Sequence, residues 1–288
     1  MSAAAARPRP TALRATVLRT ERLTPTMVRL VLGGPGLAPF TPSEHADSYV
    51  KLVFLPPAAA GELPLTSDDR VDLDALRAGL PADQQPRLRS YTVRAFDPQA
   101  LELTVDVVVH GEEGIAGPWA DGAQPGDEIL VVGPGGAYSP AEDADWHLLI
   151  GDASALPAIA VALERMGPDA QGHAFVEVHH AEDEIPLTAP EGVQVHWVHR
   201  GHGVVGLALV EAVQDLPWPD GVAHAFVHGE AGTIKELRHH LRAERGIARD
   251  RLSISGYWRL GADDEAWRAA KKAWTGAIEA DEQAAGLD

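Results

Sequence analysis

The sequence predicts two folded units of different class, an N-terminal antiparallel β-barrel followed by a doubly wound parallel α/β domain. The chain has 288 residues, which is more than a single hydrophobic core usually serves. Its first half consists of short β-prone runs separated by Gly, Pro and Asp, whereas its second half alternates apolar runs with segments of helical periodicity. Because this change falls near Pro140, we expect one domain over residues 12–139 and a second over residues 140–288.

The expected strands of the N-terminal half are short and separated by turn residues, a spacing typical of barrels and sandwiches. In the run LELTVDVVV, Leu101, Leu103, Val105, Val107 and Val109 all fall on one side of the strand. Such alternation indicates a strand with one buried face. The other expected strands are ATVLRT, MVRLVL, YVKLVFL, SYTVRAF and EILVVG.

The C-terminal half alternates strands with helices, an order that gives a parallel sheet with helices on its faces. The apolar run HLLIG precedes SALPAIAVALERM, whose apolar residues recur at helical spacing. A charged helix over residues 263–285 is the last expected element. The remaining expected elements are strands at HAFVEVHH, VQVHWVHR, AHAFVHGE and RLSISGYW and helices at LALVEAVQDL and TIKELRHHLRAERG.

Composition excludes several classes of function. The chain has no cysteine, so disulfides and cysteine-bound metal centres are excluded, and redox chemistry would need a bound organic cofactor. Its 24 basic and 42 acidic residues give a formal net charge of −18, which repels nucleic acid and anionic membranes. No apolar run reaches the ~20 residues that span a bilayer, and the first residues lack the apolar core of an export signal. We therefore expect a soluble, cytoplasmic protein.

The segment Arg89-Ser90-Tyr91-Thr92 lies on an expected barrel strand, where alternation aims Tyr91 away from Ser90 and Thr92. A guanidinium can fork onto a diphosphate, a phenol ring can stack on a flat heterocycle, and a hydroxyl can bond to a ring edge. This combination suggests a dinucleotide site. A plain strand with an exposed arginine remains the alternative, because the pattern is short.

Two Gly-rich turns follow. His110 leads into Gly114-Ile115-Ala116-Gly117-Pro118-Trp119-Ala120, where a turn entering a helix offers backbone N–H groups to phosphate. The segment Gly151-Asp152-Ala153-Ser154-Ala155 joins a buried strand to a helix, which is where nucleotide phosphates dock on parallel sheets. The alternatives are a tight turn with Trp119 in the core and an ordinary strand-to-helix turn.

The last expected strand ends in Gly256-Tyr257-Trp258-Arg259-Leu260-Gly261, where Trp258 either covers a cofactor or packs in the core. Taken in order, these segments resemble the siderophore-interacting protein family, whose members are FAD-dependent ferric-siderophore reductases. That family carries RxYT, an H-G stretch leading to G-P-A-S/T-x-W-A, then G-D-x-T-A-L-P-A-I and G-Y-W-R-x-G. The resemblance covers residues 12–275.

The resemblance implies the cofactor sites. It places the iron complex on Lys51 and Arg259, which otherwise fit solvated side chains. Three positions depart from the family pattern, because Ile115 replaces a proline, Gly117 replaces a hydroxyl residue and Gly135 replaces a frequent basic residue. One positive charge fewer on an acidic chain favours a hydroxamate or mixed-ligand complex over a trianionic catecholate. The implied cofactor residues are Arg89, Ser90, Tyr91, Thr92, His110, Gly114, Ala116, Gly117 and Trp119 for FAD, Gly151, Asp152, Ser154 and Ala155 for NAD(P)H, and Trp258 beside the cofactors.

The resemblance also implies the reaction. Electrons would pass from NAD(P)H or a ferredoxin through FAD to the ferric ion of a siderophore, and the weaker ferrous complex would then release its iron in the cytoplasm. No side chain needs to donate a proton, so we expect no catalytic acid or base, and we expect a monomer. Two alternatives stay open: a general flavin or ferredoxin reductase without a siderophore role, and a non-enzymatic ferric-siderophore-binding protein.

The 13 histidines do not predict a metal site. His196 and His199 lie three apart on an expected strand, so they face opposite sides and cannot converge on one ion. The pair His239-His240 is flanked by Arg238 and Arg242 on an expected helix. We expect these four residues to form a solvated helix face.

Overall fold

The computed structural model describes residues 10–59, 61–111 and 114–287. Its contacts divide the chain into two compact units: the first extends to Gly136, and the second runs from Ala137 onward and includes the short segments Leu23–Met27 and His45–Asp47. The first unit is an antiparallel sheet and the second is a parallel sheet with helices, as the sequence predicts. Among the described residues, no helix is both long and apolar enough to cross a membrane.

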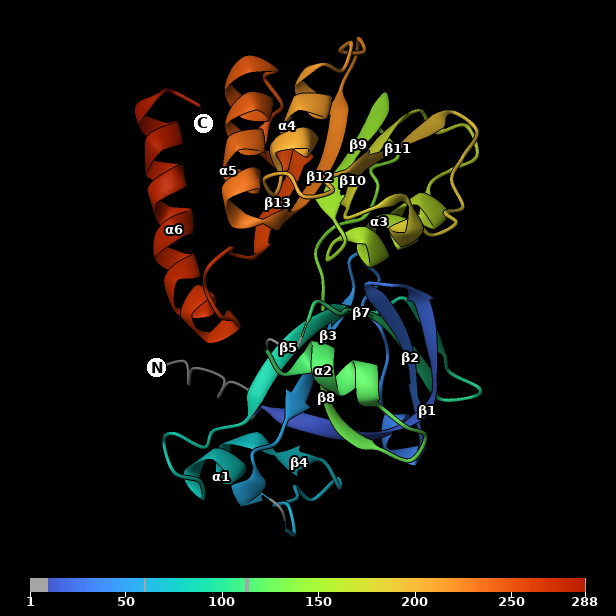
Figure 1. Ribbon diagram of the computed structural model, residues 1–288, viewed down its shortest axis with the longest axis vertical. Helices are drawn as coiled ribbons and strands as arrows, with labels where there is room; N and C mark the ends of the chain where they lie inside the picture. Colours follow the sequence, from blue (N-terminus) through green and yellow to red (C-terminus); the bar gives the residue numbers. More distant parts are fainter. Residues whose placement is uncertain (1–9, 60, 112–113, 288) are drawn as a thin grey trace, which may run out of the picture. The chain divides into compact units, whose positions relative to one another are not determined.

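The first unit is an eight-stranded sheet with the order β5-β3-β8-β1-β2-β7-β6, and β4 pairs with β1 beside this path (Figure 1). The two ends of the sheet are tied together, because the Arg94 N–H donates to the Thr104 carbonyl at 2.9 Å. The sheet thereby closes into the expected barrel. Its strands are β1 (Thr11–Thr24), β2 (Met27–Gly33), β3 (Tyr49–Phe54), β4 (Val71–Asp72), β5 (Arg87–Thr92), β6 (Ala95–Asp97), β7 (Glu102–Val108) and β8 (Glu128–Gly135).

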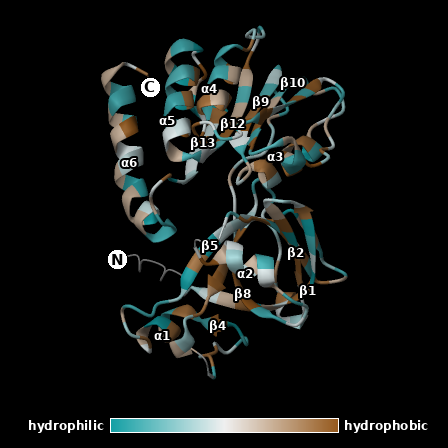
Figure 2. Ribbon diagram, in the orientation of Figure 1, coloured by the Kyte–Doolittle hydropathy of each residue, from teal (hydrophilic) through white to brown (hydrophobic). Residues whose placement is uncertain are grey.

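The barrel core consists of the inward residues of these strands. Leu103, Val105 and Val107 of β7 are at most 1% exposed, which confirms the alternation predicted for LELTVDVVV. Helix α2 (Ala116–Gly122) adds the buried Ala120 to this core. Helix α1 (Leu73–Ala78) helps cover a second apolar cluster on the barrel exterior, and its first turn is capped by the Asp72 carboxylate. The apolar strand positions appear brown in Figure 2.

The second unit is a five-stranded parallel sheet with the order β11-β10-β9-β12-β13. The order reverses between β9 and β12, which makes the carboxyl ends of these two strands the topological switch point where open α/β sheets bind ligands. The strands are β9 (Trp146–Asp152), β10 (Gly172–Val178), β11 (Val193–His199), β12 (Ala223–Glu230) and β13 (Leu252–Trp258). The helices are α3 (Leu156–Arg165), α4 (Leu207–Gln214), α5 (Ala231–His239) and α6 (Asp264–Ala284).

The prediction that Arg238, His239, His240 and Arg242 form a solvated helix face is wrong for three of them, because only His239 is exposed. Arg238, His240 and Arg242 are each less than 10% exposed. The Arg238 guanidinium donates through two nitrogens to the carboxylate of Glu282 on α6, at 2.5 and 2.7 Å. Because that partner lies 44 residues further along the chain, a local run of charged residues gives no sign that its face is covered.

Candidate functional site

Arg89 and Tyr91 share one face of β5, the strand at one end of the barrel order. In the antiparallel register, Tyr91 pairs with Val50 and Arg89 pairs with Leu52. Both partners are fully buried core residues, and Tyr91 packs against the same core. A guanidinium and a phenol ring therefore stand two residues apart on one surface of the strand, as the predicted dinucleotide site requires.

Ser90 and Thr92 lie on the opposite face of β5. Ser90 pairs with Lys51, and Thr92 pairs with Tyr49. Ser90 is exposed, whereas Thr92 is buried. The structure thus divides the motif between two strand faces, one with Arg89 and Tyr91 and one shared with the predicted substrate residue Lys51. A role of Ser90 and Thr92 in binding FAD stays a prediction.

Trp119 lies toward the far end of the Arg89–Tyr91 face. Phe54 pairs with Arg87 at the start of β5, and the Phe54 ring meets the Trp119 ring edge to face with centroids 5.5 Å apart. From Tyr91 to Arg87, β5 advances about 13 Å at ~3.3 Å per residue. The strand and the indole together border an elongated surface, which suits an extended ligand such as a dinucleotide.

The Gly-rich turn before α2 brings backbone N–H groups to this part of the barrel. Gly114 has φ +81, a left-handed conformation that favours glycine. Ile115 caps α2 and has no side-chain acceptor for the N–H groups of the first turn. His110 is exposed just before the turn. A guanidinium, a phenol and backbone N–H donors are the groups that a flavin and a diphosphate require, so the residues present fit FAD.

Gly117 is not required by the fold. A Cβ atom added there would lie 3.5 Å from the Val108 carbonyl oxygen and 3.7 Å from the Val109 Cα atom, which is ordinary contact. The hydroxyl residue of the family pattern would therefore fit at this position. Its absence removes one side-chain hydrogen-bond donor from this turn.

Gly135, in contrast, is covered by the ring of Tyr49. The two residues pair between β3 and β8, and a Cβ atom at residue 135 would lie 2.5 Å from the Tyr49 hydroxyl oxygen and 2.6 Å from Cε1. A basic residue at 135 cannot coexist with this position of the ring. An aromatic side chain thus takes the place of a cation on the face that carries Lys51.

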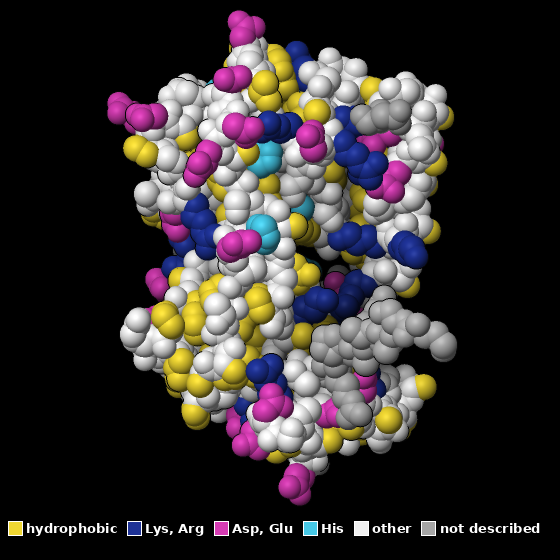
Figure 3. Space-filling model, turned by 180° about the vertical axis from the view of Figure 1, so that it is seen from behind, with side chains coloured by type: hydrophobic (Ala, Val, Ile, Leu, Met, Phe, Trp, Pro, Cys, Tyr) yellow, Lys and Arg dark blue, Asp and Glu magenta, His cyan; other side chains and the backbone are white. Residues whose placement is uncertain are grey.

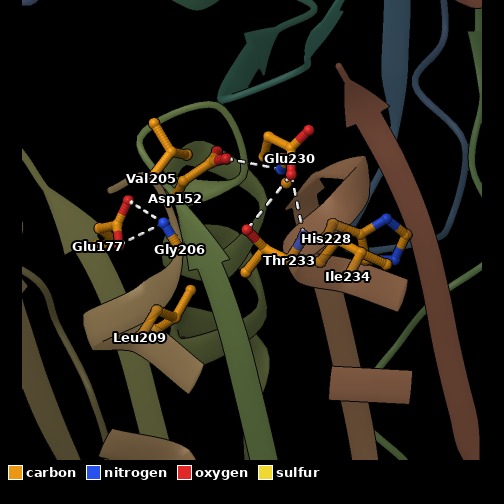
Figure 4. Close-up of a pocket in the computed structure, with 10 residues that line it drawn as sticks. Asp152, Glu177, Val205, Gly206, Leu209, His228, Glu230, Thr233 and Ile234 are labelled. Atoms are coloured by element: carbon orange, nitrogen blue, oxygen red, sulfur yellow. Dashed lines mark hydrogen bonds between the residues drawn. The ribbon is translucent and has the colours of Figure 1, made fainter. Parts of the chain in front are cut away.

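The carboxyl ends of three parallel strands carry buried carboxylates (Figure 4): Asp152 on β9, Glu177 on β10 and Glu230 on β12. They border a small indentation at the edge of the sheet. Burial raises the pKa of both Asp152 and Glu177. The switch point is therefore acidic and mostly enclosed.

Asp152 joins three strand ends. Its carboxylate accepts hydrogen bonds from the Ser154 N–H at 2.9 Å and the Ser154 hydroxyl at 2.5 Å. It also accepts from the Glu230 N–H at 2.9 Å and from the Trp258 indole N–H at 2.8 Å. These four bonds favour the charged carboxylate and oppose the effect of burial. Asp152 therefore fixes the positions of Ser154 and Trp258.

The other two carboxylates also accept backbone donors. The Gly206 N–H lies 3.0 and 3.2 Å from the two oxygens of Glu177. Glu230 accepts from the Thr233 N–H at 2.9 Å and from the Leu260 N–H at 3.1 Å. Neither glutamate was among the predicted site residues, because each lies in a strand run and no sequence neighbour indicates a role for its carboxylate.

The predicted nucleotide residues build this edge of the sheet. Gly151 is needed for close packing, because a Cβ atom there would lie 2.8 Å from the His228 carbonyl oxygen. Ala155 is fully buried. Since Ser154 donates to Asp152 through both its backbone and its side chain, direct contacts of Gly151, Ser154 and Ala155 with a nucleotide stay predictions.

The two predicted substrate cations lie in different units. Lys51 is a partly exposed residue of β3 in the barrel. Arg259 follows β13 in the α/β unit, is exposed, and places its guanidinium carbon 6.0 Å from the Trp267 ring centre. Both retain surface from which a cation can meet an anionic ligand, and their role stays a prediction.

The histidines of β11 diverge as predicted. A ring nitrogen of His196 lies 3.0 Å from one of His173, whereas His199 lies 2.6 Å from the Glu184 carboxylate. Within residues 10–59, 61–111 and 114–287, no three His, Asp or Glu side chains are arranged to hold a metal ion. His228, whose ring points away from the carboxylates in Figure 4, is buried, and burial lowers its pKa to about 3.

Comparison with known proteins gives matches along most of the chain. Residues 16–138 match the siderophore-interacting FAD-binding domain, and residues 144–261 match the siderophore-interacting protein domain. An uncharacterized protein of Mycobacterium tuberculosis is 49% identical over 89% of this chain and 93% of its own length. Ferric vibriobactin reductase ViuB of Vibrio cholerae is 37% identical over 87% of this chain and 90% of its own. A siderophore utilization protein from T. fusca has a similar structure, with a TM-score of 0.75 and 38% identity over 88% of this chain and 95% of that one.

An antiparallel barrel followed by a doubly wound parallel sheet is the fold of the ferredoxin-reductase-like class. Within that class, the chain belongs to the siderophore-interacting protein family. The family resemblance predicted from the RxYT, GDxxALPAI and GYWRxG segments is confirmed.

Proposed function

We propose that this protein is an FAD-dependent ferric-siderophore reductase that receives electrons from NAD(P)H or a ferredoxin in the cytoplasm. The observation that carries the proposal is the Arg89–Tyr91 face of β5, with Trp119 near one end and a Gly-rich turn before α2. Membership of the family and the likeness to a ferric vibriobactin reductase support it.

The chain's own residues hold and orient the cofactor. Arg89 would neutralise the FAD diphosphate, and the Tyr91 ring would stack on the flat ring system. Bound FAD accepts electrons in pairs and can release them singly, which suits ferric iron as an acceptor. Backbone N–H groups around Gly114 would complete the phosphate contacts, because Gly117 supplies no hydroxyl.

The substrate surface would lie on the Lys51 side of β3. Lys51 supplies a positive charge, while Tyr49 covers Gly135 where family members often carry a second basic residue. Fewer positive charges hold a trianionic complex less well. We therefore expect preference for a neutral ferric hydroxamate or a mixed-ligand complex. Reduction weakens the hold of hard oxygen donors on iron, so no protein acid or base is required for release.

The test is an anaerobic mixture of dithionite-reduced, FAD-loaded protein with a ferric trihydroxamate and a ferrous chelator. The proposal predicts a ferrous signal well above that of the same concentration of free reduced FAD. A signal equal to the free-flavin background would contradict a siderophore role and favour a general flavin reductase. Protein that cannot take up FAD would favour a ferric-siderophore-binding protein.

The charge preference has its own test. Initial rates with a neutral ferric trihydroxamate and a trianionic ferric tris-catecholate would be compared in the natural protein and in the double variant Tyr49→Ala, Gly135→Arg. We expect the ratio of catecholate to hydroxamate rates to rise about tenfold in the variant, the effect of roughly 1.4 kcal/mol of added attraction. An unchanged ratio would remove Tyr49 and Gly135 from the substrate surface.

A further inference from the structure

Four cationic or titratable side chains gather at the carboxyl ends of β10 and β11. The ring centres of His179 and His180 are 4.1 Å apart, and each lies 6.0 Å from the ring centre of His202. Arg200 follows β11 and contributes to the electrostatic environment of His179. We call His179, His180, Arg200 and His202 the histidine patch. Figure 3 colours histidine side chains cyan and Lys and Arg side chains dark blue on one face of the molecule.

The backbone holds the histidine patch in place. The Arg200 N–H donates to the Val178 carbonyl at 3.0 Å, and the Gly201 N–H donates to the His179 carbonyl at 2.8 Å. Gly201 has φ +55, the left-handed conformation that lets the chain turn sharply after β11. This turn carries His202 over the end of β10. The patch is therefore a fixed arrangement on two strand ends.

Carboxylates near the histidine patch already have partners. Asp183 accepts hydrogen bonds from the Thr26 hydroxyl at 2.6 Å and from the His180 N–H at 3.1 Å, and Glu184 pairs with His199. The Asp183 N–H in turn donates to the His180 carbonyl at 3.0 Å. Asp183 and Glu184 are therefore engaged by groups other than the Arg200 guanidinium, whose ion-pair partner is Glu177.

The histidine patch lies where doubly wound sheets bind the adenosine ribose of a nicotinamide nucleotide. In doubly wound sheets the end of the strand next to the first one contacts the adenosine ribose, where an acidic residue accepts the 2′-hydroxyl of NADH and an arginine accommodates the 2′-phosphate of NADPH. Here β10 is that strand, beside β9. Its acidic residue, Glu177, is 4% exposed and engaged with the Gly206 N–H. Arg200 approaches Glu177 only at 3.6 Å through Nε, which is beyond hydrogen-bond range.

We propose that the histidine patch binds the 2′-phosphate of NADPH and makes this site prefer NADPH to NADH. The inference rests on the proposed function, because it names the reductant of the same protein. Two apolar side chains are exposed after Arg200, Val204 in the loop at 68% and Leu207 at the start of α4 at 50%. An adenine ring laid on this loop would remove that apolar surface from water.

The proposal also predicts that nucleotide affinity depends on pH, through protonation of the histidines. In the ligand-free protein, partial burial and then the neighbouring charges of His180, Arg200 and His202 lower the pKa of His179, while Asp183 opposes them. A phosphate dianion stabilises the charged imidazole, so binding takes up protons and affinity rises as pH falls toward ~6, where the phosphate itself begins to gain a proton.

The test is calorimetric titration of the full FAD-loaded chain with 2′,5′-ADP and with 5′-ADP, at about pH 6.5 and about pH 8. We expect 2′,5′-ADP to bind at least about tenfold more tightly at the lower pH, with a smaller difference at the higher pH. The triple variant His179→Gln, Arg200→Gln, His202→Gln should lose this preference. His239→Gln, an exposed histidine of the same unit outside the patch, should keep it.

Equal affinity for the two nucleotides, binding of neither, or a preference that survives the triple variant would each overturn the proposal. Ferrous release by dithionite-reduced protein needs no nucleotide. A protein that passes that assay but shows no preference for 2′,5′-ADP would therefore retain the proposed function and lose only this inference.

Discussion

The predicted cofactor motifs of the two units differ in what their side chains contact. In the barrel, Arg89 and Tyr91 stand on one strand face, and Ser90 between them points the other way. In the α/β unit, Ser154 bonds to Asp152, and Asp152 also accepts hydrogen bonds from the neighbouring strand ends. A short motif can thus present side chains to a ligand or hold a binding edge together, and only the hydrogen-bond partners distinguish these tasks.

The largest effect should come from the buried ion pair that fastens α6 to the α/β unit. Glu282→Gln leaves the Arg238 guanidinium without its anion, and we expect a loss of about 3 kcal/mol in the free energy of unfolding. Urea unfolding followed by tryptophan fluorescence measures it, since Trp267 and Trp274 lie on α6. FAD content should stay unchanged if the barrel holds the flavin.

Arg249→Gln is the matched control for this variant. It removes a partner of Glu279 on the same helix, in a pair whose side chains are 64% and 41% exposed. Such exposed pairs contribute no more than about 1 kcal/mol. Equal losses in the two variants would show that the Arg238 pair is not specially protected from water.

Arg89→Ala should weaken FAD binding roughly 30-fold, about 2 kcal/mol, because a charge-assisted contact to the diphosphate is lost. Titration of flavin-free protein with FAD gives the affinity. The affinity of Arg89→Lys should lie between those of the natural protein and Arg89→Ala, because lysine keeps the positive charge but lacks the two parallel N–H donors of arginine. Arg77→Ala on α1, which removes a surface arginine paired with Asp74, should bind FAD normally. Unchanged affinity in Arg89→Ala would move the flavin away from this face of β5.

The sequence predicted the barrel motif better than the sheet edge, for a physical reason. Strand alternation is local, so LELTVDVVV and Arg89-Ser90-Tyr91-Thr92 gave their facing directions directly. Glu177 and Glu230 meet only because parallel strands far apart in sequence end at one edge. Burial of Arg238 depends on Glu282, and the cover over Gly135 depends on Tyr49. None of these pairings leaves a trace in the local pattern.

His228 should make the α/β unit sensitive to acid. Its pKa lies at about 3 in the folded chain against an ordinary value of 6.5, so only the unfolded state takes up this proton between those values. Stability from the neutral ring is complete above about pH 6.5 and declines as pH falls, by up to about 1.4 kcal/mol per pH unit.

The variant His228→Gln should flatten this dependence. Urea unfolding of the natural protein and the variant at several pH values between 4.5 and 7, roughly the range over which imidazole titrates, gives the two slopes. The difference in slope is the readout, whatever the variant does to overall stability. Parallel slopes would show that His228 is not held neutral.

Gly117→Ser should give the smallest effect, a gain. Space for its Cβ atom exists beside Val108, and one hydroxyl hydrogen bond to the phosphate should tighten FAD binding about fivefold, near 1 kcal/mol. Gly117→Ala is the control, because it adds the carbon without the hydroxyl. Equal affinities in the two variants would place the phosphate elsewhere.

The most direct test of the central claim is FAD uptake by the purified chain, read by flavin absorbance and fluorescence. A flavin stacked on Tyr91 predicts stoichiometric FAD with quenched fluorescence, and Tyr91→Leu should restore much of that fluorescence. A colourless protein that takes up no FAD, or a bound flavin whose fluorescence ignores Tyr91→Leu, would contradict the assignment of the flavin to this face of the barrel.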